Sequence, residues 1–268
     1  MIRHSPRKRF GQHFLHDAHV LERLVEAIAP APEDVLVEIG PGEGALTRRL
    51  LERVRHMEAV EIDRDLAAHL AVVFPPERLV VHCADVLEFD FTRLPEGMRV
   101  VGNLPYNIST PLLFRLAEFA TRIRDMHFML QREVVERMVA RCSTPEYGRL
   151  SVMLQTRFAM AKLFRVAPGA FRPPPKVESA VVKLVPLAAH ARPQVDDSVL
   201  AQLVVRAFSA RRKTLRNALG LQAADFAALD IDPGLRPENL SPEDYVRIAQ
   251  RLSARGRGSA KPPADGVR

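Results

Sequence analysis

The sequence of 268 residues has little cysteine and no long apolar run, and each shortage excludes a class of protein. Only two cysteines occur, Cys83 and Cys142, so a disulfide framework is not expected and a reduced, cytosolic protein is. No apolar stretch approaches the ~18 residues that cross a bilayer, which argues against a membrane protein. The basic N-terminus lacks the apolar core of a signal peptide. We therefore expect a soluble, cytoplasmic protein with no membrane partner.

Acidic residues are missing from three stretches of the chain, so the charge is unevenly spread. The net charge is +7, yet residues 33–96 hold 14 acidic against 7 basic side chains. The acid-free stretches are residues 1–16, 147–177 and 198–224. One basic stretch is ordinarily a solvated helix face, but three together indicate a surface for a polyanion beside an acidic lobe for a small molecule.

Apolar strands alternate with amphipathic helices through the first half of the chain. The patterns predict strands at residues 35–40, 56–63, 78–85, 99–106 and 126–131. They predict helices at residues 44–54, 64–74, 111–120 and 132–142. Asp17 is placed to cap an earlier helix, and Thr110 followed by Pro111 is typical of a helix start. The alternation predicts an α/β, doubly wound, Rossmann-like parallel sheet with right-handed crossovers.

The pattern changes after Gly148. Residues 159–166 and 179–186 predict two antiparallel strands that form a hairpin at one edge of the sheet. A linker then leads to a helical remainder, in which Asp197 or Ser198 begins one helix and Ser241 caps another. The expected segments are a basic N-terminal arm (1–16), a larger domain (17–187), a helical domain (194–252) and a disordered tail (253–268).

The glycine-rich stretch "EIGPGEG" (38–44) joins a predicted strand to a predicted helix. Glycine allows a tight turn there and a close approach of backbone to a ligand. Glu61 lies 21 positions after Gly40 at the end of the next strand, where a carboxylate can accept both hydroxyls of a ribose. Enzymes that use nicotinamide dinucleotides and enzymes that use S-adenosylmethionine (SAM) share this arrangement.

The residues around this turn favour SAM over a nicotinamide cofactor. A dinucleotide needs a free helix N-terminus for its pyrophosphate, whereas Pro41 and Glu43 crowd the turn. SAM has no phosphate and carries a cationic sulfonium and ammonium, which suit an acidic lobe. Asp85, at the end of the third strand, can accept a hydrogen bond from the adenine amino group. No metal site is expected.

The strand at residues 99–106 ends in the sequence Asn-Leu-Pro-Tyr. The exocyclic amine of adenine is a poor nucleophile, because its lone pair is delocalised into the ring. The side-chain oxygen of Asn103 and the carbonyl of Leu104 can accept its N–H bonds and localise that lone pair. Pro105 fixes the turn, and Tyr106 offers a face on which an extruded base can stack. This combination predicts an N6-adenine methyltransferase that works mostly by positioning its reactants.

Five motifs resemble the family of rRNA adenine N6,N6-dimethyltransferases, in its bacterial small-subunit (KsgA) type. They lie at residues 7–15, 37–47, 103–113, 171–182 and 208–219. The resemblance runs from about residue 7 to 250 and implies dimethylation of two adjacent adenosines near the 3′ end of small-subunit rRNA, late in subunit assembly. It places around SAM the residues His13, Leu15, Gly40, Glu61, Asp85 and Asn103. His13 departs from the family pattern, which has asparagine at that position.

The resemblance also implies a second aromatic residue, Phe171, near the target base beside Tyr106. Arg211, Arg212, Lys213 and Arg216 are expected on one stretch of helix that contacts rRNA phosphates, with an affinity that falls steeply with salt. The arm residues expected to fold over SAM and RNA together are Arg7, Lys8 and Arg9.

Three other functions share part of this pattern. The related dimethyltransferases of large-subunit rRNA, which confer macrolide resistance, have the same glycine turn and Asn-x-Pro-Tyr core. A non-enzymatic ribosome assembly factor on the same fold would have degraded motifs, and here they are intact. A DNA adenine methyltransferase would need a separate target-recognition domain, for which this length leaves little room. The partners expected are therefore the small ribosomal subunit and its rRNA, bound by a monomer.

Overall fold

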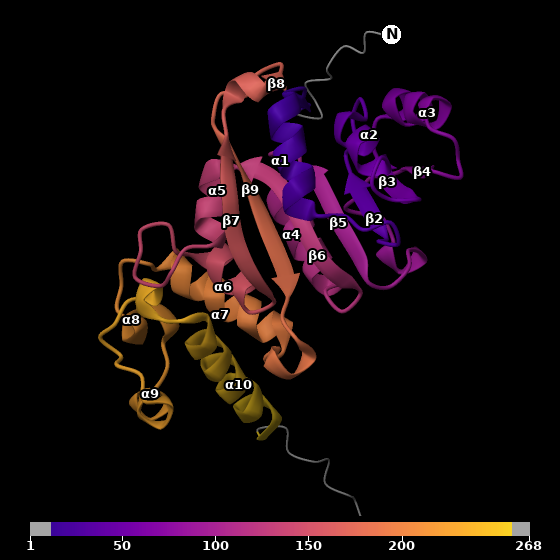
Figure 1. Cartoon of the computed structure of the whole chain (residues 1–268). Helices are drawn as coiled ribbons and strands as arrows, with labels where there is room; N and C mark the ends of the chain where they lie inside the picture. Colours follow the sequence, from indigo (N-terminus) through magenta and orange to yellow (C-terminus); the bar gives the residue numbers. More distant parts are fainter. Residues whose placement is uncertain (1–11, 259–268) are drawn as a thin grey trace, which may run out of the picture. The chain divides into compact units, whose positions relative to one another are not determined.

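The computed structural model describes residues 12–258, which divide into two compact units (Figure 1). The first unit runs to Val139 and continues with Phe158–Pro186, and the second contains Ala140–Arg157 and begins again at Leu187. Sequence reasoning placed residues 140–157 in the larger domain. The structure instead buries Tyr147 and Val152 in the apolar core of the second unit.

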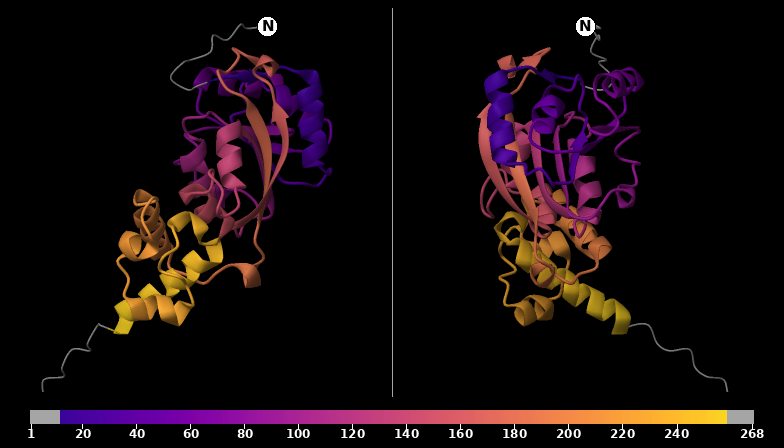
Figure 2. Two further views of the ribbon diagram at one scale, coloured as in Figure 1. Left: turned by 90° about the vertical axis from the view of Figure 1, so that its left-hand side faces the viewer. Right: turned by 45° about the vertical axis from the view of Figure 1, so that its right-hand side comes forward.

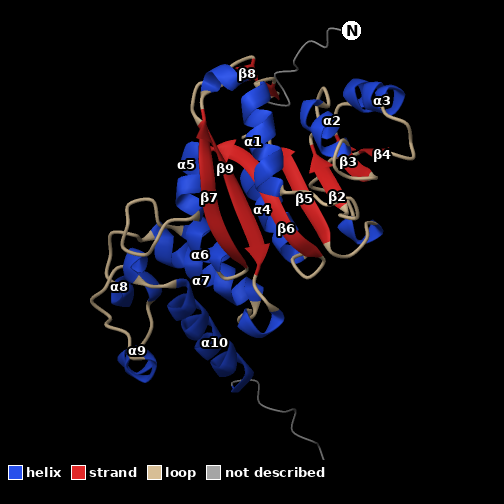
Figure 3. Ribbon diagram, in the orientation of Figure 1, coloured by secondary structure: helices blue, strands red, loops and turns tan. Residues whose placement is uncertain are grey.

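A seven-stranded sheet forms the centre of the first unit, in the order β4-β3-β2-β5-β6-β9-β7 (Figure 3). The parallel strands are β2 (Leu36–Ile39), β3 (Met57–Glu61), β4 (Leu79–Cys83), β5 (Met98–Asn103) and β6 (Ile123–Gln131). β9 (Ser179–Pro186) runs antiparallel to both β6 and the edge strand β7 (Phe158–Val166). The predicted doubly wound sheet with an antiparallel edge hairpin is confirmed.

Helices cover both faces of this sheet. They are α1 (Ala18–Ile28), α2 (Ala45–Leu51), α3 (Arg64–Val73), α4 (Ser109–Glu118) and α5 (Arg132–Met138). The views of Figures 1 and 2 place α1 on one face and α4 and α5 on the other. Leu24, Leu50 and Leu70, from the first three helices, are fully buried in one core cluster with residues of the sheet. The sheet is therefore a layer between helices, as a parallel sheet requires.

The first residues of α1 and α4 can be compared with the N-caps predicted for these helices. Asp17 caps α1, because its side chain accepts a hydrogen bond from the backbone N–H of Val20 at 3.0 Å. Thr110 was expected to cap α4, and this is wrong. α4 begins at Ser109, two residues before the predicted start at Pro111, and the Ser109 hydroxyl donates to the carbonyl oxygen of Tyr106 at 3.1 Å. This bond fixes the chain directly after the Asn-Leu-Pro-Tyr stretch.

A second, two-stranded sheet was not predicted. β1 (Phe14–Leu15) pairs antiparallel with β8 (Phe171–Arg172), so that Phe14 lies opposite Arg172 and Leu15 opposite Phe171. Each strand has only two residues, too few to produce a recognisable alternation in the sequence. The pairing brings the start of the described chain to the proline-rich loop before β9.

Arg99, near the start of β5, is a buried charge held by two carboxylates. Its guanidinium donates to both carboxylate oxygens of Asp125, at 2.9 and 3.0 Å, and to Asp34 at 2.6 Å. It also donates to the carbonyl oxygens of Ile28 and Ala29, at the end of α1. Burial acts to raise the pKa of Asp34, but its hydrogen bonds to Ala31 and Arg99 hold that pKa below its usual value. This network fixes the strand that ends at Asn103.

The second unit is helical. Its helices are α6 (Arg149–Gln155), α7 (Asp197–Ser209), α8 (Leu215–Leu219), α9 (Ala223–Leu229) and α10 (Pro242–Gly258). α7 begins at Asp197, one of the two predicted starts, and the side chain of Asp196 caps it. The predicted Ser241 cap of α10 is confirmed, since the Ser241 hydroxyl accepts from the Asp244 N–H at 3.1 Å. Short 3₁₀ segments occur at Phe91–Arg93, Pro168–Ala170, Ala189–Ala191 and Pro237–Asn239.

α10 continues through Gly258, although the tail was expected to be disordered from Ser253. The reason lies in Asp225, a buried carboxylate that forms ion pairs with Arg251 at 2.8 Å and Arg255 at 2.6 Å. These two arginines lie one helical turn apart and hold the end of α10. No helix within residues 12–258 is long and apolar enough to cross a membrane.

Candidate active site

A cavity of about 330 Å³ opens at the carboxyl ends of β2, β3 and β5 in the first unit. Its wall includes the glycine-rich turn after β2, the acidic end of β3, the Asn-Leu-Pro-Tyr stretch after β5 and residues around β1. Open α/β sheets bind their ligands at this edge. The structure therefore brings together in one cavity the segments that the sequence singled out one by one.

The glycine turn makes room for β1. Gly42 has a φ of +58°, and a Cβ atom built on it would lie 3.0 Å from the Phe14 ring. The turn after β2 therefore packs directly against the start of the described chain. Gly40, the predicted cofactor contact in this turn, lines the cavity, and its N–H donates to the carbonyl oxygen of Val60 at 2.9 Å.

Glu61 lies at the end of β3, buried and inside the cavity. Its two carboxylate oxygens accept hydrogen bonds from the backbone N–H groups of Gly42, at 3.1 Å, and Asp63, at 2.9 Å. Each oxygen retains capacity for another donor, as the two hydroxyls of a ribose require. Burial raises the pKa of Glu61, against the lowering effect of these backbone hydrogen bonds.

Glu38, on β2, is a second buried carboxyl group in the cavity wall. The hydroxyl of Thr47 donates to it at 2.6 Å. Burial, and less strongly the nearby charge of Glu61, raise the pKa of Glu38 to about 7, while the Thr47 hydrogen bond opposes the rise. The charge of the cavity therefore changes near neutral pH.

Glu38→Gln is expected to alter how the free energy of unfolding depends on pH. The folded chain keeps the Glu38 proton up to about pH 7, whereas the unfolded chain releases it near 4.5. Folding therefore takes up a proton between these values, and the stability of the unmodified protein falls as the pH rises through them. Relative to the unmodified protein, the variant should gain about 3 kcal/mol between pH 4.5 and 8.

Urea unfolding of both proteins across this range measures the difference. Glu43→Gln is the matched control, because Glu43 lines the same cavity but is exposed. A stability difference between Glu38→Gln and the unmodified protein that is the same at pH 5 and pH 8 would contradict the prediction.

The charged groups that line the cavity fit SAM. The carboxylates that line it are Glu38, Glu43, Glu61 and Asp85, and no lysine or arginine joins them among the described residues. Such a lining attracts a sulfonium and an ammonium and repels a pyrophosphate. Asp85 accepts a hydrogen bond from the Leu87 N–H through one carboxylate oxygen, at 2.9 Å, and keeps its other oxygen for a ligand donor.

Gly102 explains how Asn103 comes so close to the glycine turn. A Cβ atom on Gly102 would lie 2.5 Å from the backbone oxygen of Ile39, the last residue of β2. Any side chain at position 102 would push β5 and β2 apart at their carboxyl ends. Its absence lets Asn103 lie beside the cofactor turn.

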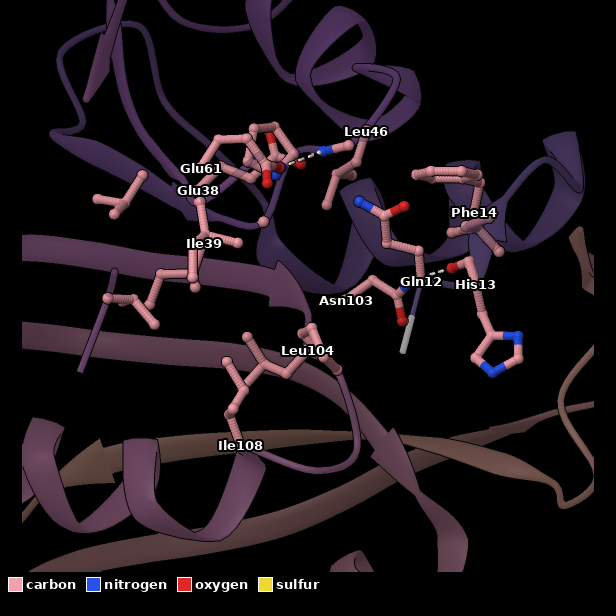
Figure 4. A pocket seen from close by; sticks show the side chains of 18 of the residues that line it. Gln12, His13, Phe14, Glu38, Ile39, Leu46, Glu61, Asn103, Leu104 and Ile108 are labelled. Atoms are coloured by element: carbon pink, nitrogen blue, oxygen red, sulfur yellow. Dashed lines mark hydrogen bonds between the residues drawn. The ribbon is translucent and has the colours of Figure 1, made fainter. Parts of the chain in front are cut away.

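The orientation of the Asn103 amide follows from one hydrogen bond. Its Nδ2 donates to the backbone oxygen of His13 at 2.8 Å (Figure 4). An amide turned the other way would bring two oxygens together, so the NH2 group must face His13. The Oδ1 atom therefore points away from His13 and is available to accept a hydrogen bond from a base amine.

The three residues after Asn103 are also fixed in place. The Leu104 N–H donates to the carbonyl oxygen of Met129 at 3.1 Å, and Leu104 and Pro105 line the cavity. The Tyr106 hydroxyl shares a hydrogen bond of 2.8 Å with the hydroxyl of Ser179 on β9. Burial raises the pKa of Tyr106 despite this bond, so the phenol is neutral at physiological pH. Tyr106 thus presents a neutral ring at the cavity.

Phe171 does not take the place predicted for it. It is only 2% exposed, belongs to the core cluster and is not part of the cavity wall. Its pairing with Leu15 in the small sheet explains this, because the two side chains enter the same core. Leu15 is 7% exposed and reaches both the core and the cavity.

The predicted RNA-contacting residues are only partly described. Arg7, Lys8 and Arg9 lie outside the described residues. The second basic set was expected on one helix and instead lies on a turn and the helix after it: α7 ends at Ser209, and Arg216 is on α8. Extended backbone at Thr214, with ψ of 158°, breaks the helix between them.

The members of this set differ in their contacts. Arg211 forms an ion pair with Glu238 and donates to the carbonyl oxygen of Pro145 at 2.9 Å. Arg212, Lys213 and Arg216 are exposed. Arg211 therefore stabilises the second unit, whereas the other three present their charges to solvent.

Sequence reasoning missed Gln12 and Ser179, and it treated Glu38 only as part of an acidic lobe. Gln12 lines the cavity and donates to Asp63 at 3.3 Å. The contacts of Gln12 and Ser179 join segments far apart in the chain, which spacing along one segment cannot reveal. A buried acid inside an otherwise apolar strand was the signal available for Glu38.

Comparison with known proteins identifies the family of this chain. The family model described as ribosomal RNA adenine dimethylase matches residues 3–254. A protein of Thiobacillus denitrificans called ribosomal RNA small subunit methyltransferase A is 59% identical over 94% of this chain and all of that protein. Its namesake in Aromatoleum aromaticum is 58% identical over 95% of this chain and 97% of that protein.

Two solved structures share the fold. A dimethyladenosine transferase from Plasmodium falciparum superposes with a TM-score of 0.81 at 24% identity, over 91% of this chain and 98% of that one. The 23S rRNA methyltransferase ErmE superposes with a TM-score of 0.68 at 27% identity, over 90% of this chain and 99% of that one. By its sequence, the chain belongs to the ribosomal RNA adenine dimethylases, a family of SAM-dependent methyltransferases.

Proposed function

We propose that this protein dimethylates the N6 amines of two adjacent adenosines near the 3′ end of small-subunit rRNA, with SAM as the methyl donor. The observation that carries the proposal is the orientation of Asn103, whose Nδ2 is held by the His13 carbonyl so that Oδ1 is left for the base amine. The names of the two relatives above, at 59% and 58% identity, support the small subunit as the substrate.

Each part of the site has a role in this proposal. Glu61 accepts the ribose hydroxyls, and Asp85 accepts from the adenine amine of the cofactor. The remaining proposed cofactor contacts are the backbone of residue 13 and the residues Leu15, Gly40 and Asn103, all in the cavity wall. Bound SAM supplies a methyl group on a positively charged sulfur. The carboxylate lining attracts that charge, and the surrounding residues hold the methyl group in line with the target nitrogen.

The Asn-Leu-Pro-Tyr stretch binds and orients the target base. The Oδ1 atom of Asn103 and the carbonyl of Leu104 accept the N–H bonds of the amine, which localises its lone pair for attack. Tyr106 stacks on the extruded base. No general base is needed in this scheme, since the proton leaves after the methyl group is attached.

The proposed rRNA contacts are the arm residues Arg7, Lys8 and Arg9 and, separately, the exposed cations of the second unit. Those cations are Arg212, Lys213 and Arg216, with Arg211 bracing the turn that carries them. The protein acts as a cytoplasmic monomer on a late assembly intermediate of the small subunit.

The deciding experiment is methyl transfer from labelled SAM to undermethylated small ribosomal subunits, with large subunits as the parallel substrate. Mass spectrometry of the nucleosides is expected to find dimethyladenosine in small-subunit rRNA alone. Label in large-subunit rRNA would instead assign the protein to the activity of its structural neighbour ErmE. Tight binding to small subunits without any label would make it a non-enzymatic assembly factor.

A further inference from the structure

His13 contacts three separate parts of the active site. Its backbone oxygen accepts the Asn103 amide at 2.8 Å. Its imidazole Nδ1 lies 2.7 Å from the carbonyl oxygen of Pro173, in the loop that follows β8. Its ring stacks on the Tyr106 ring, with centroids 5.8 Å apart and planes 29° apart. One residue thus joins the β1 segment, the end of β5 and the proline-rich loop.

The imidazole is turned toward Tyr106 and away from the acidic side of the cavity. Figure 4 shows the His13 ring pointing away from Glu38 and Glu61, which lie on the opposite side of Asn103. The Pro173 carbonyl can only accept a hydrogen bond, so the Nδ1 atom carries a hydrogen. The ring is therefore fixed in orientation by a bond to the loop and not by a group on the cofactor side.

The contacts of His13 complete the anchoring of Tyr106. The phenol hydroxyl is held by Ser179 at 2.8 Å, which fixes the far end of the side chain. The imidazole packs against the ring, with the two centroids 5.8 Å apart, and so restricts its rotation. Removal of the imidazole would leave Tyr106 without this ring contact.

We propose that the His13 imidazole is a positioning residue for the target adenine: it holds the Tyr106 ring and the Pro173 loop as one wall and determines which face of Tyr106 receives the base. This inference rests on the proposed function, because the base in question is the adenine to be methylated. The backbone of residue 13 still serves Asn103. The imidazole itself acts on the base and not on SAM.

The test compares His13→Ala, His13→Asn and His13→Phe with the unmodified protein. Two quantities are measured: the SAM dissociation constant by calorimetry, and kcat with KM for undermethylated small subunits at saturating SAM. We expect His13→Ala to lower kcat about tenfold or more, because a reactant displaced by about 1 Å can cost ~10²-fold in rate. Its SAM dissociation constant should change less than about twofold, since RT ln 2 is only ~0.4 kcal/mol.

The other two variants separate the ring from the hydrogen bond. His13→Phe keeps a ring against Tyr106 and should fall between His13→Ala and the unmodified protein. His13→Asn keeps a donor but no ring and should resemble His13→Ala in kcat. His19→Ala, an exposed histidine of α1, is the matched control and should behave as the unmodified protein. Equal melting temperatures across the series verify that each variant folds.

Two results would overturn the inference while the proposed function stands. One is a His13→Ala protein with unchanged kcat. The other is a raised SAM dissociation constant with full kcat at saturating SAM, which would make the imidazole a cofactor contact. An unmodified protein that transfers no methyl group to small subunits would overturn the proposed function and this inference together.

Discussion

Replacing Asn103 by alanine is expected to lower kcat about 10²–10³-fold, the loss typical when one preorganised hydrogen-bonding group is removed from a transition state. The amide oxygen is the acceptor that localises the lone pair of the target amine. Its direction is set by the His13 carbonyl, which holds Nδ2 at 2.8 Å. Single-turnover methyl transfer to undermethylated small subunits, at saturating SAM, measures this loss directly.

Asn103→Asp tests whether catalysis needs an accepting oxygen in a fixed orientation or only an accepting oxygen at this position. Aspartate keeps two oxygens but lacks the N–H that binds the His13 carbonyl, so its carboxylate is repelled from that carbonyl and leaves its place. We expect Asn103→Asp to be nearly as slow as Asn103→Ala, with circular dichroism unchanged for both. A rate for Asn103→Asp close to that of the unmodified protein would show that orientation by His13 is not needed.

Arg99→Met should lower the free energy of unfolding by about 3–5 kcal/mol, because it leaves two buried carboxylates without their common cation. The guanidinium side chain is 5% exposed, and those of Asp34 and Asp125 are 7% and 10% exposed. Activity per folded molecule should fall as well, because Arg99 lies on the strand that ends at Asn103. Urea unfolding measures the stability.

Arg124→Met is the matched control. Arg124 forms an ion pair with the same Asp34 at 2.8 Å, but its side chain is 63% exposed. Exposed pairs contribute about 0–1 kcal/mol, so this variant should be nearly as stable as the unmodified protein. Adding Asp125→Asn to Arg99→Met should recover part of the lost stability, because it removes one of the two buried carboxylate charges that Arg99 had neutralised. Equal costs for Arg99→Met and Arg124→Met would refute the burial argument.

Local patterns predicted most of the first unit. Continuous apolar runs identified the parallel strands, and the cap at Asp17 identified the start of α1, because both signals depend on neighbours within a few residues. The start of α4 was missed by two residues, since its first contact is a side-chain bond from Ser109 back to Tyr106. The continuation of α10 was missed because Arg251 and Arg255 are held by Asp225, on a different helix.

The sequence patterns predicted the individual segments of the candidate site but not the long-range contacts between them. The glycine turn, Glu61, Asp85 and the Asn-Leu-Pro-Tyr stretch follow strands, and the carboxyl-edge rule brings them together. The burial of Phe171 could not be foreseen, because its exposure depends on the pairing with Leu15, far away in sequence. The Pro173 contact of His13 joins residues 160 positions apart and has no local signal.

The pairing of β1 with β8 has a consequence for how the enzyme matures during its own translation. Phe14 is among the first described residues to be made, yet its partner Arg172 is added only after six strands of the central sheet have been synthesised. A nascent chain that stops before Arg172 therefore has no partner for β1 and no Pro173 carbonyl for His13. Methyl transfer should thus be acquired late, when the segment that pairs with β1 and contacts His13 has left the ribosome that makes it.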